Sequence, residues 1–106
     1  MIRYRRTFNV KQIQIIMRDC INGLDYINKL NMVHTDIKPE NIVFRENGDF
    51  HVKLIDFGNA VITAYPRKGL INTRHYRAPE VILDLEWYKS SDIWGLGCVI
   101  MELYCG

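Results

Sequence analysis

The spacing of hydrophobic residues predicts a long amphipathic helix over residues 9–30. Apolar side chains recur there at steps of three and four residues, which is the period of a helix with one buried face. Asn9 and Gln12 match a capping box that would start this helix. Gly23, inside the helix, indicates a close packing contact, because glycine there destabilises a helix by about 1 kcal/mol relative to alanine. The apolar positions are Ile13, Ile16, Met17, Cys20, Ile21, Leu24 and Ile27.

A second helix is predicted over residues 90–105, and it is apolar on nearly all sides. Ser90, Ser91 or Asp92 could cap its first turn. Since it is well short of the ~20 residues that span a bilayer, we expect it in a protein core and not in a membrane. Without further chain to cover it, it would form a large exposed apolar patch that favours aggregation or a partner. Its apolar residues are Ile93, Trp94, Leu96, Cys98, Val99, Ile100, Met101 and Leu103.

Between the two helices, the pattern predicts short strands and a loop. Two apolar runs, residues 42–44 and 50–55, flank Asn47-Gly48 and predict an antiparallel β-hairpin. Residues 32–33 predict a short strand before it, and residues 59–77 predict a loop because proline, glycine and polar residues are frequent there. We therefore expect an α+β protein that is mainly helical and contains one small hairpin.

Two registers are possible for this hairpin. A two-residue turn would set Asn41 opposite Leu54, and a three-residue turn would set it opposite Ile55. The second register is favoured because it places the apolar side chains of both strands on one face. Either register brings Asn41 beside the strand end that leads into Asp56.

Composition limits the class of protein. A length of 106 residues allows one domain at most, and 48% hydrophobic residues is typical of a globular protein. A net charge of +2 is too small to indicate binding to nucleic acid or to an anionic membrane. The basic start of the chain is not followed by an apolar signal core, so secretion is not expected. Cys20, Cys98 and Cys105 have no metal-ligand spacing, and we expect buried thiols in a reducing, intracellular compartment.

Two carboxylates, an ammonium and a carboxamide are predicted to meet near the hairpin. Asp36 is a candidate to position or deprotonate an attacking hydroxyl, and Lys38 is a candidate to neutralise a phosphoryl group. Asn41 and Asp56 offer oxygens of the kind that Mg²⁺ prefers, beside water and phosphate. Phosphoryl transfer depends mainly on positioning and electrostatics, so no covalent nucleophile is required. A lone Asp-Phe-Gly is a common turn and a lone His-x-Asp is usually structural, so the interpretation depends on the joint pattern.

These motifs resemble those of eukaryotic protein kinases. His-Thr-Asp-Ile-Lys-Pro-Glu-Asn at residues 34–41 resembles the catalytic loop, and Asp-Phe-Gly at 56–58 resembles the magnesium motif. Ala-Pro-Glu at 78–80 resembles the end of the activation segment, and all three occur in the family order. His-Thr-Asp in place of His-Arg-Asp, together with residues 72–80, resembles the LAMMER or CDC-like branch of the CMGC kinases, which act on Ser/Thr and Tyr.

The resemblance implies a fold, cofactors and a partner. Residues 1–106 would form a partial kinase domain: the supporting helix, catalytic loop, activation segment and central helix of the C-lobe. The N-lobe would be absent, because neither a Gly-rich phosphate loop nor a Val-Ala-x-Lys strand precedes His34. The cofactors would be ATP and Mg²⁺, and the partner would be a protein substrate. A nuclear location, alongside the cytoplasm, follows from the resemblance alone.

The resemblance also implies roles for residues around the catalytic loop. The Thr73 hydroxyl would bond Asp36 and Lys38, and Asp92 would bond the backbone of the catalytic loop. Val43 would form the floor of the adenine pocket, with simple core packing as the alternative. His34 would be a packed imidazole near Asp-Phe-Gly instead of a ligand or a base.

Three further positions bear on regulation and substrate. Thr35 cannot pair with a phosphate as the commoner arginine does, so any activity is not expected to depend on an activation-loop phosphate. Arg77 matches an arginine typical of CMGC kinases near the substrate pocket. Glu80 would normally pair with a distant arginine that is not in this chain, so we expect it to stay solvated or to find a substitute.

Two functions follow from these observations. The first is a protein kinase that uses ATP and Mg²⁺, with activity expected to be impaired in these residues alone. The alternative is a catalytically inactive kinase remnant or an interaction module. Small-molecule phosphotransferases share the His-x-Asp core, but Lys38 and Ala-Pro-Glu favour protein substrates.

We predict that these 106 residues alone do not detectably phosphorylate a generic basic protein, because the phosphate loop and its lysine are missing. Losing single electrostatic stabilisers of this kind lowers rates by about 10²–10³. Transfer of radiolabel from ATP measures the activity. Transfer that is abolished by Asp56→Ala would contradict the prediction.

Overall fold

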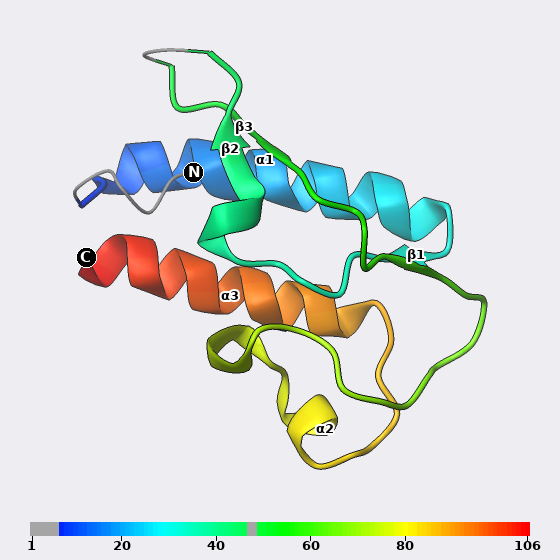
Figure 1. Ribbon diagram of the computed structural model, residues 1–106. Coiled ribbons are helices and arrows are strands. Elements are labelled where there is room, and N and C mark those ends of the chain that lie inside the picture. Colours follow the sequence, from blue (N-terminus) through cyan, green and yellow to red (C-terminus); the bar gives the residue numbers. More distant parts are fainter. Residues whose placement is uncertain (1–6, 47–48) are drawn as a thin grey trace.

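The computed structural model describes residues 7–46 and 49–106. Two long helices, α1 (Val10–Lys29) and α3 (Ser90–Cys105), pack against each other and run in opposite directions (Figure 1). A hairpin of β2 (Ile42–Phe44) and β3 (Val52–Leu54) packs on α1, and the short helix α2 (Pro79–Ile82) lies beyond α3. The predicted α+β class with a mainly helical fold is therefore observed.

Helix α1 forms as its periodicity predicts. The Asn9 side chain accepts a hydrogen bond from the Gln12 N–H at 2.9 Å, and the Gln12 side chain accepts one from the Asn9 N–H at 3.0 Å. This confirms the capping box, which satisfies two backbone donors that a helix start leaves unpaired. One face of the helix is buried, through Ile13, Ile16, Cys20, Leu24 and Ile27.

The hairpin has the favoured register. Ile42 pairs with Leu54, and the Ile55 N–H donates to the Asn41 carbonyl at 2.9 Å, so Asn41 lies opposite Ile55. The pairing continues beyond the two strands, because the Arg45 N–H donates to the His51 carbonyl at 2.8 Å. The three-residue length of the turn stays a prediction. Asn47-Gly48 lies outside the described residues.

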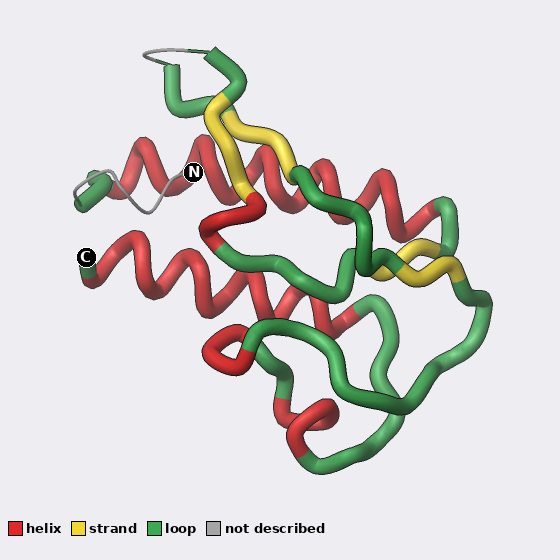
Figure 2. Tube along the Cα trace, in the orientation of Figure 1, coloured by secondary structure: helices red, strands yellow, loops and turns green. Residues whose placement is uncertain are grey.

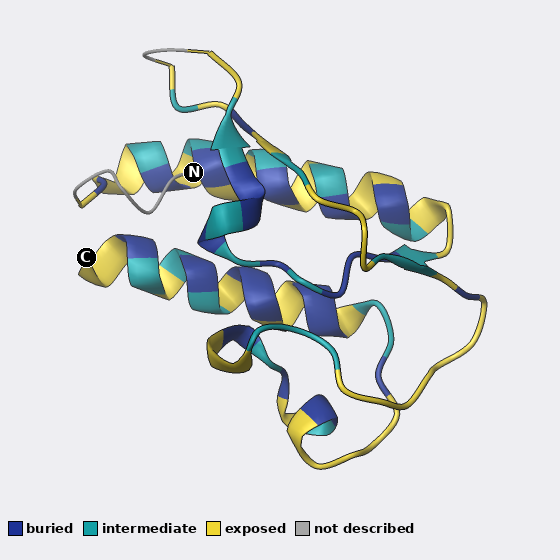
Figure 3. Cartoon of the chain, in the orientation of Figure 1, coloured by how far each residue is buried: buried dark blue, intermediate teal, exposed yellow. Residues whose placement is uncertain are grey.

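Glycine at position 23 brings α1 close to the hairpin. A Cβ atom at Gly23 would lie 3.3 Å from Cδ1 of Leu54, so the predicted close contact is confirmed and its partner is β3. The main hydrophobic core lies between α1, the hairpin and α3, as the buried faces in Figure 3 show. A second, smaller cluster is formed by Val33, Ala78, Val81 and Trp87.

The predicted loop over residues 59–77 is only partly a loop (Figure 2). Strand β1 (Met32–Val33) forms as predicted and pairs antiparallel with β4 (Val61–Ile62). A 3₁₀ turn, η2, spans Arg74–Tyr76, and another, η1, spans Pro39–Asn41. Strand β4 has only two residues and is held by a partner distant in sequence, so the local pattern around it could not predict it.

Helix α3 is covered on one face only. The covered face carries Ser91, Asp92, Gly95, Leu96, Val99 and Leu103. On the other side Trp94 is 48% exposed and Met101 is 61% exposed, which confirms the predicted apolar patch. The described part of the chain contains no helix that is both long and apolar enough to cross a membrane.

The predicted cap of α3 is wrong. Lys89 occupies the cap position with helical backbone angles, and no side chain caps the first turn. The Ser91 hydroxyl donates to the Tyr88 carbonyl at 2.8 Å, and the Asp92 carboxylate accepts from the His34 and Thr35 N–H groups instead.

The cysteines differ from the expectation of three buried thiols. Cys20 is buried, Cys98 is half-buried and Cys105 is exposed. Cys105 lies in the last turn of α3, where the chain described here provides no cover. Burial raises the pKa of the Cys20 thiol to about 12, with a smaller contribution from the neighbouring Asp19 carboxylate.

Replacing Asn9 by alanine removes the cap of α1 and leaves a backbone N–H without its acceptor. We expect Asn9→Ala to lower the free energy of unfolding by about 1 kcal/mol. Urea unfolding of the two proteins measures this difference. Asn22→Ala, on the exposed surface of the same helix, is the matched control and should not destabilise; equal losses in both variants would rule out the capping role.

Candidate active site

A buried carboxylate at the start of α3 fixes the loop that follows β1. Asp92 Oδ2 accepts a hydrogen bond from the His34 N–H at 2.7 Å, and its Oδ1 accepts one from the Thr35 N–H at 3.1 Å. A Cβ atom at Gly95 would lie 3.2 Å from the Ile37 carbonyl oxygen, which is a tight contact, so glycine here favours the close approach of the loop to α3. The expected role of Asp92 is confirmed. Its burial raises its pKa, against the lowering effect of the two N–H donors.

His34 is fully buried and uses both ring nitrogens. Nε2 lies 2.9 Å from the Ile55 carbonyl, which can only accept, so Nε2 carries the proton. Nδ1 then accepts from the Asp36 N–H at 3.1 Å, and the ring packs 4.8 Å from that of Phe57. This confirms the prediction of a packed imidazole near Asp-Phe-Gly, which joins the loop to the end of β3.

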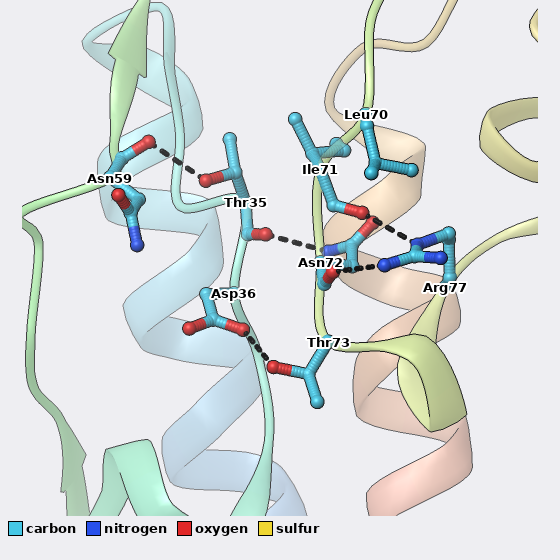
Figure 4. A pocket seen from close by; sticks show the side chains of 8 residues that line it. All are labelled: Thr35, Asp36, Asn59, Leu70, Ile71, Asn72, Thr73 and Arg77. Carbon is cyan, nitrogen blue, oxygen red and sulfur yellow. Dashed lines mark hydrogen bonds between the residues drawn. The ribbon is translucent and has the colours of Figure 1, made fainter.

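Three predicted site residues form one hydrogen-bonded group. The Thr73 hydroxyl donates to Asp36 Oδ1 at 2.9 Å, and the Lys38 ammonium donates to the Thr73 hydroxyl oxygen at 3.0 Å (Figure 4 shows the first of these bonds). Lys38 Nζ also lies 3.5 Å from Asp36 Oδ2. The two charged side chains keep 24% and 15% of their surfaces exposed, so a reactant can reach them.

Asn41 and Asp56 lie at neighbouring strand ends. The Asn41 amide nitrogen donates to the Asp36 carbonyl at 2.9 Å and reaches Asp36 Oδ2 at 3.5 Å, which leaves the amide oxygen outside these bonds. Asp56 follows Ile55, the residue paired with Asn41, and its side chain is exposed. Its Oδ1 accepts only a long bond, 3.4 Å, from the Gly58 N–H.

This donor set fits magnesium. Within the described residues, no group of three or more His, Cys, Asp or Glu side chains is placed to hold a metal ion. A site here would use one carboxylate and one amide oxygen, with water and phosphate completing the shell. Mg²⁺ is commonly held this way, since it keeps several waters and takes few protein ligands.

Val43 lies on the open face of the hairpin. Its neighbours in β2, Ile42 and Phe44, pack in the main core, and successive side chains of a strand point to opposite faces. Val43 is half-buried and is not among the residues of the two described core clusters, so both interpretations of this position stay predictions.

A hollow of about 410 Å³ opens beside Asp36 (Figure 4). Arg77 shapes its wall: Nε donates to the Ile71 carbonyl and Nη2 donates to the Asn72 carbonyl, each at 2.9 Å. Sequence reasoning singled out Arg77 but missed Asn72, because a lone asparagine in a loop carries no local signal. The hollow is lined by Thr35, Asp36, Asn59, Leu70, Ile71, Asn72, Thr73 and Arg77.

Glu80 lies away from this group, at a second hollow of about 850 Å³ on the uncovered side of α3. Its side chain is half-buried and makes no ion pair with the residues that the structure describes. The expectation that Glu80 stays solvated or finds a substitute partner stays a prediction.

Replacing Asp92 by asparagine removes the titrating group. Because burial raises its pKa above the ordinary 3.8, the folded protein holds this proton more tightly than the unfolded chain does. The free energy of unfolding of the wild type, relative to Asp92→Asn, should therefore fall as pH rises above 3.8, by at most about 1.4 kcal/mol per pH unit, and level off above the folded-state pKa. Urea unfolding across this range tests the sign, with exposed Asp25→Asn as control. A relative stability that rises with pH would overturn it.

Comparison with known proteins agrees with this geometry. Residues 1–106 match the family described as "Protein kinase domain". The chain is 34% identical over 93% of its length to the dual specificity protein kinase lkh1 of Schizosaccharomyces pombe, and spans 17% of that protein. It is 40% identical over 89% of its length to a probable dual specificity protein kinase YAK1 homolog of Encephalitozoon cuniculi, and spans 23% of it. A crystal structure of a kinase domain matches with a TM-score of 0.85 at 37% identity, over 93% of this chain and 36% of that one. Loop geometry, family match and structural likeness agree that this chain belongs to the protein kinase family.

Proposed function

We propose that the protein transfers the γ-phosphoryl group of ATP to Ser, Thr and Tyr hydroxyls of protein substrates, and that these residues form the central part of its C-lobe. The observation that carries the proposal is the Thr73 hydroxyl, which bonds Asp36 on one side and Lys38 on the other. It fixes an acceptor for a hydroxyl proton beside a cation, which is the pairing that in-line phosphoryl transfer needs. The names of the relatives, dual specificity protein kinases, support the substrate class.

Asp36 and Lys38 have separate tasks in this proposal. Asp36 Oδ1 is held by Thr73, so the carboxylate has a fixed orientation when a substrate hydroxyl approaches. It orients that hydroxyl and accepts its proton. The Lys38 ammonium lies within 3.5 Å of the same carboxylate and stabilises the negative charge on the phosphoryl group in transfer.

Asn41 and Asp56 would hold Mg²⁺, and Val43 would lie under the adenine ring. When bound, the ion neutralises phosphate charge and orients the terminal phosphate. The Asn41 amide ties that site to Asp36, because its nitrogen donates to the Asp36 carbonyl while its oxygen remains for the metal. Contacts to the opposite side of the nucleotide would come from sequence other than these residues.

The test is phosphoryl transfer by the protein expressed with whatever its gene encodes on either side of these residues. Asp36→Asn and Asp56→Asn should each lower kcat by about 10²–10⁴, because one removes the proton acceptor and the other a metal ligand. Asp25→Asn is the matched control: Asp25 lies on the surface of α1 and pairs only with Lys29 among the described residues. Wild-type rates in both site variants would refute the proposal.

The second candidate is an inactive interaction module, favoured by the exposed apolar hollow on α3. In that case the wild type transfers no phosphate and binds no ATP–Mg²⁺, and the substitutions of Asp36 and Asp56 change neither result. Measuring ATP–Mg²⁺ binding by calorimetry alongside transfer separates the two functions.

A further inference from the structure

Thr35 has a backbone conformation that its side chain disfavours. Its φ is +73°, in the left-handed region, which is uncommon for any residue other than glycine and a genuine outlier for a β-branched one. The residue is only 3% exposed and comes directly before Asp36. A strained residue persists where its surroundings hold it, and such residues cluster at functional sites.

Every polar group of Thr35 is held by a different part of the site. Its N–H donates to Asp92 Oδ1, and its hydroxyl donates to the Asn59 carbonyl at 2.8 Å. Its carbonyl accepts two hydrogen bonds from Asn72, one from the backbone N–H at 2.9 Å and one from the side-chain amide at 2.8 Å. Figure 4 shows the hydroxyl bond to Asn59 and a bond from Asn72 to the Thr35 carbonyl.

Asn72 is equally committed to this arrangement. Its φ is +67°, which asparagine tolerates better than most residues. Its carbonyl accepts from Arg77, and its backbone N–H and its side-chain amide nitrogen both donate to the Thr35 carbonyl. Its Oδ1 is buried without a hydrogen bond, which is unfavourable. A side chain that was free to rotate would turn this oxygen to solvent, so the bonds to Thr35 hold the amide in place.

These bonds place consecutive residues opposite each other. Thr35 pairs with Asn72, and the next residue of the loop, Asp36, pairs with the next residue of the segment, Thr73. The Thr35 hydroxyl bonds a third segment, because it donates to the carbonyl of Asn59. This segment contains Asp56, three residues before Asn59. One residue thereby links the proton acceptor, the metal-binding segment and the threonine that fixes the acceptor.

We infer that Thr35 and Asn72 are positioning residues, which set the Asp36 carboxylate against the Thr73 hydroxyl and hold the segment of Asp56 beside it. The inference rests on the proposed function. Neither side chain needs to touch a substrate to act in this way. Their effect is on the geometry of the reacting groups, where a displacement of about 1 Å can lower a rate by about 10².

The experiment compares four variants of the full protein. Asn72→Gly removes the side-chain bond while keeping the backbone N–H and suiting the positive φ, so it should fold. Thr35→Val removes the hydroxyl at nearly constant shape, and Thr35→Ser restores it. Asp84→Gly is the matched control, because Asp84 is exposed and has a φ of +58° like Asn72 but lies away from the site.

The readouts are kcat, the KM for ATP and for the protein substrate, and hydrogen exchange of the amides of residues 72 and 73. Asn72→Gly and Thr35→Val should each lower kcat about tenfold with little change in either KM. The same two variants should speed exchange of these amides. Thr35→Ser should keep most of kcat with slow exchange, and Asp84→Gly should match the wild type.

Several results would overturn the inference. One is an unchanged kcat in Asn72→Gly and Thr35→Val, whether or not exchange becomes faster. Another is a raised KM for the protein substrate at constant kcat, which would make these residues part of a substrate surface only. If the wild type transfers no phosphate, the proposed function fails, and hydrogen exchange then tests the inference. Faster exchange in the two variants supports the positioning of residues 72 and 73 by Thr35 and Asn72, and unchanged exchange overturns it.

Discussion

Two hydrogen bonds from the catalytic loop to one buried carboxylate hold the site together. Asp92 accepts the N–H groups of His34 and Thr35, and it does so from the first turn of a helix that packs in the main core. These bonds therefore fix the loop and the start of α3 relative to each other. No side chain caps α3, and Asp92, one of the three candidates for the cap, bonds the loop instead. Burial removes water from this carboxylate and disfavours its ionised form, which lowers the stability of the fold. The same contact fixes the position of the loop relative to α3.

The parts of the fold that local pattern predicts are those with repeated apolar positions. Helix α1, its capping box and the register of the hairpin follow from which side chains must share a buried face. Strand β4 does not, because it depends on pairing with β1, which lies far away in the sequence. Thr63, for example, donates its N–H to the carbonyl of Asn31, and nothing in the neighbourhood of either residue encodes that meeting.

The site divides in a similar way. The grouping of Asp36, Lys38 and Thr73 was predictable because motif and family resemblance specify their order and their roles. Asn72 was not, since its contribution arises from an amide turned inward at a left-handed backbone position. The sequence therefore indicates the charged candidate site residues, such as Asp36 and Lys38, more readily than a neutral residue such as Asn72, which fixes how the segments lie next to each other.

The burial of Cys20 has a consequence for how this fold can be followed in solution. A thiol with a pKa of about 12 is ionised in only about one molecule in 10⁵ at pH 7, and the thiolate is the form that reacts with electrophiles. The sulfur lies on the face of α1 that packs in the core, whereas Cys105 is exposed at the end of α3. An alkylating reagent should therefore react quickly with Cys105 and should reach Cys20 only when α1 separates from its neighbours. The rate at which Cys20 is alkylated would then report how often the core opens.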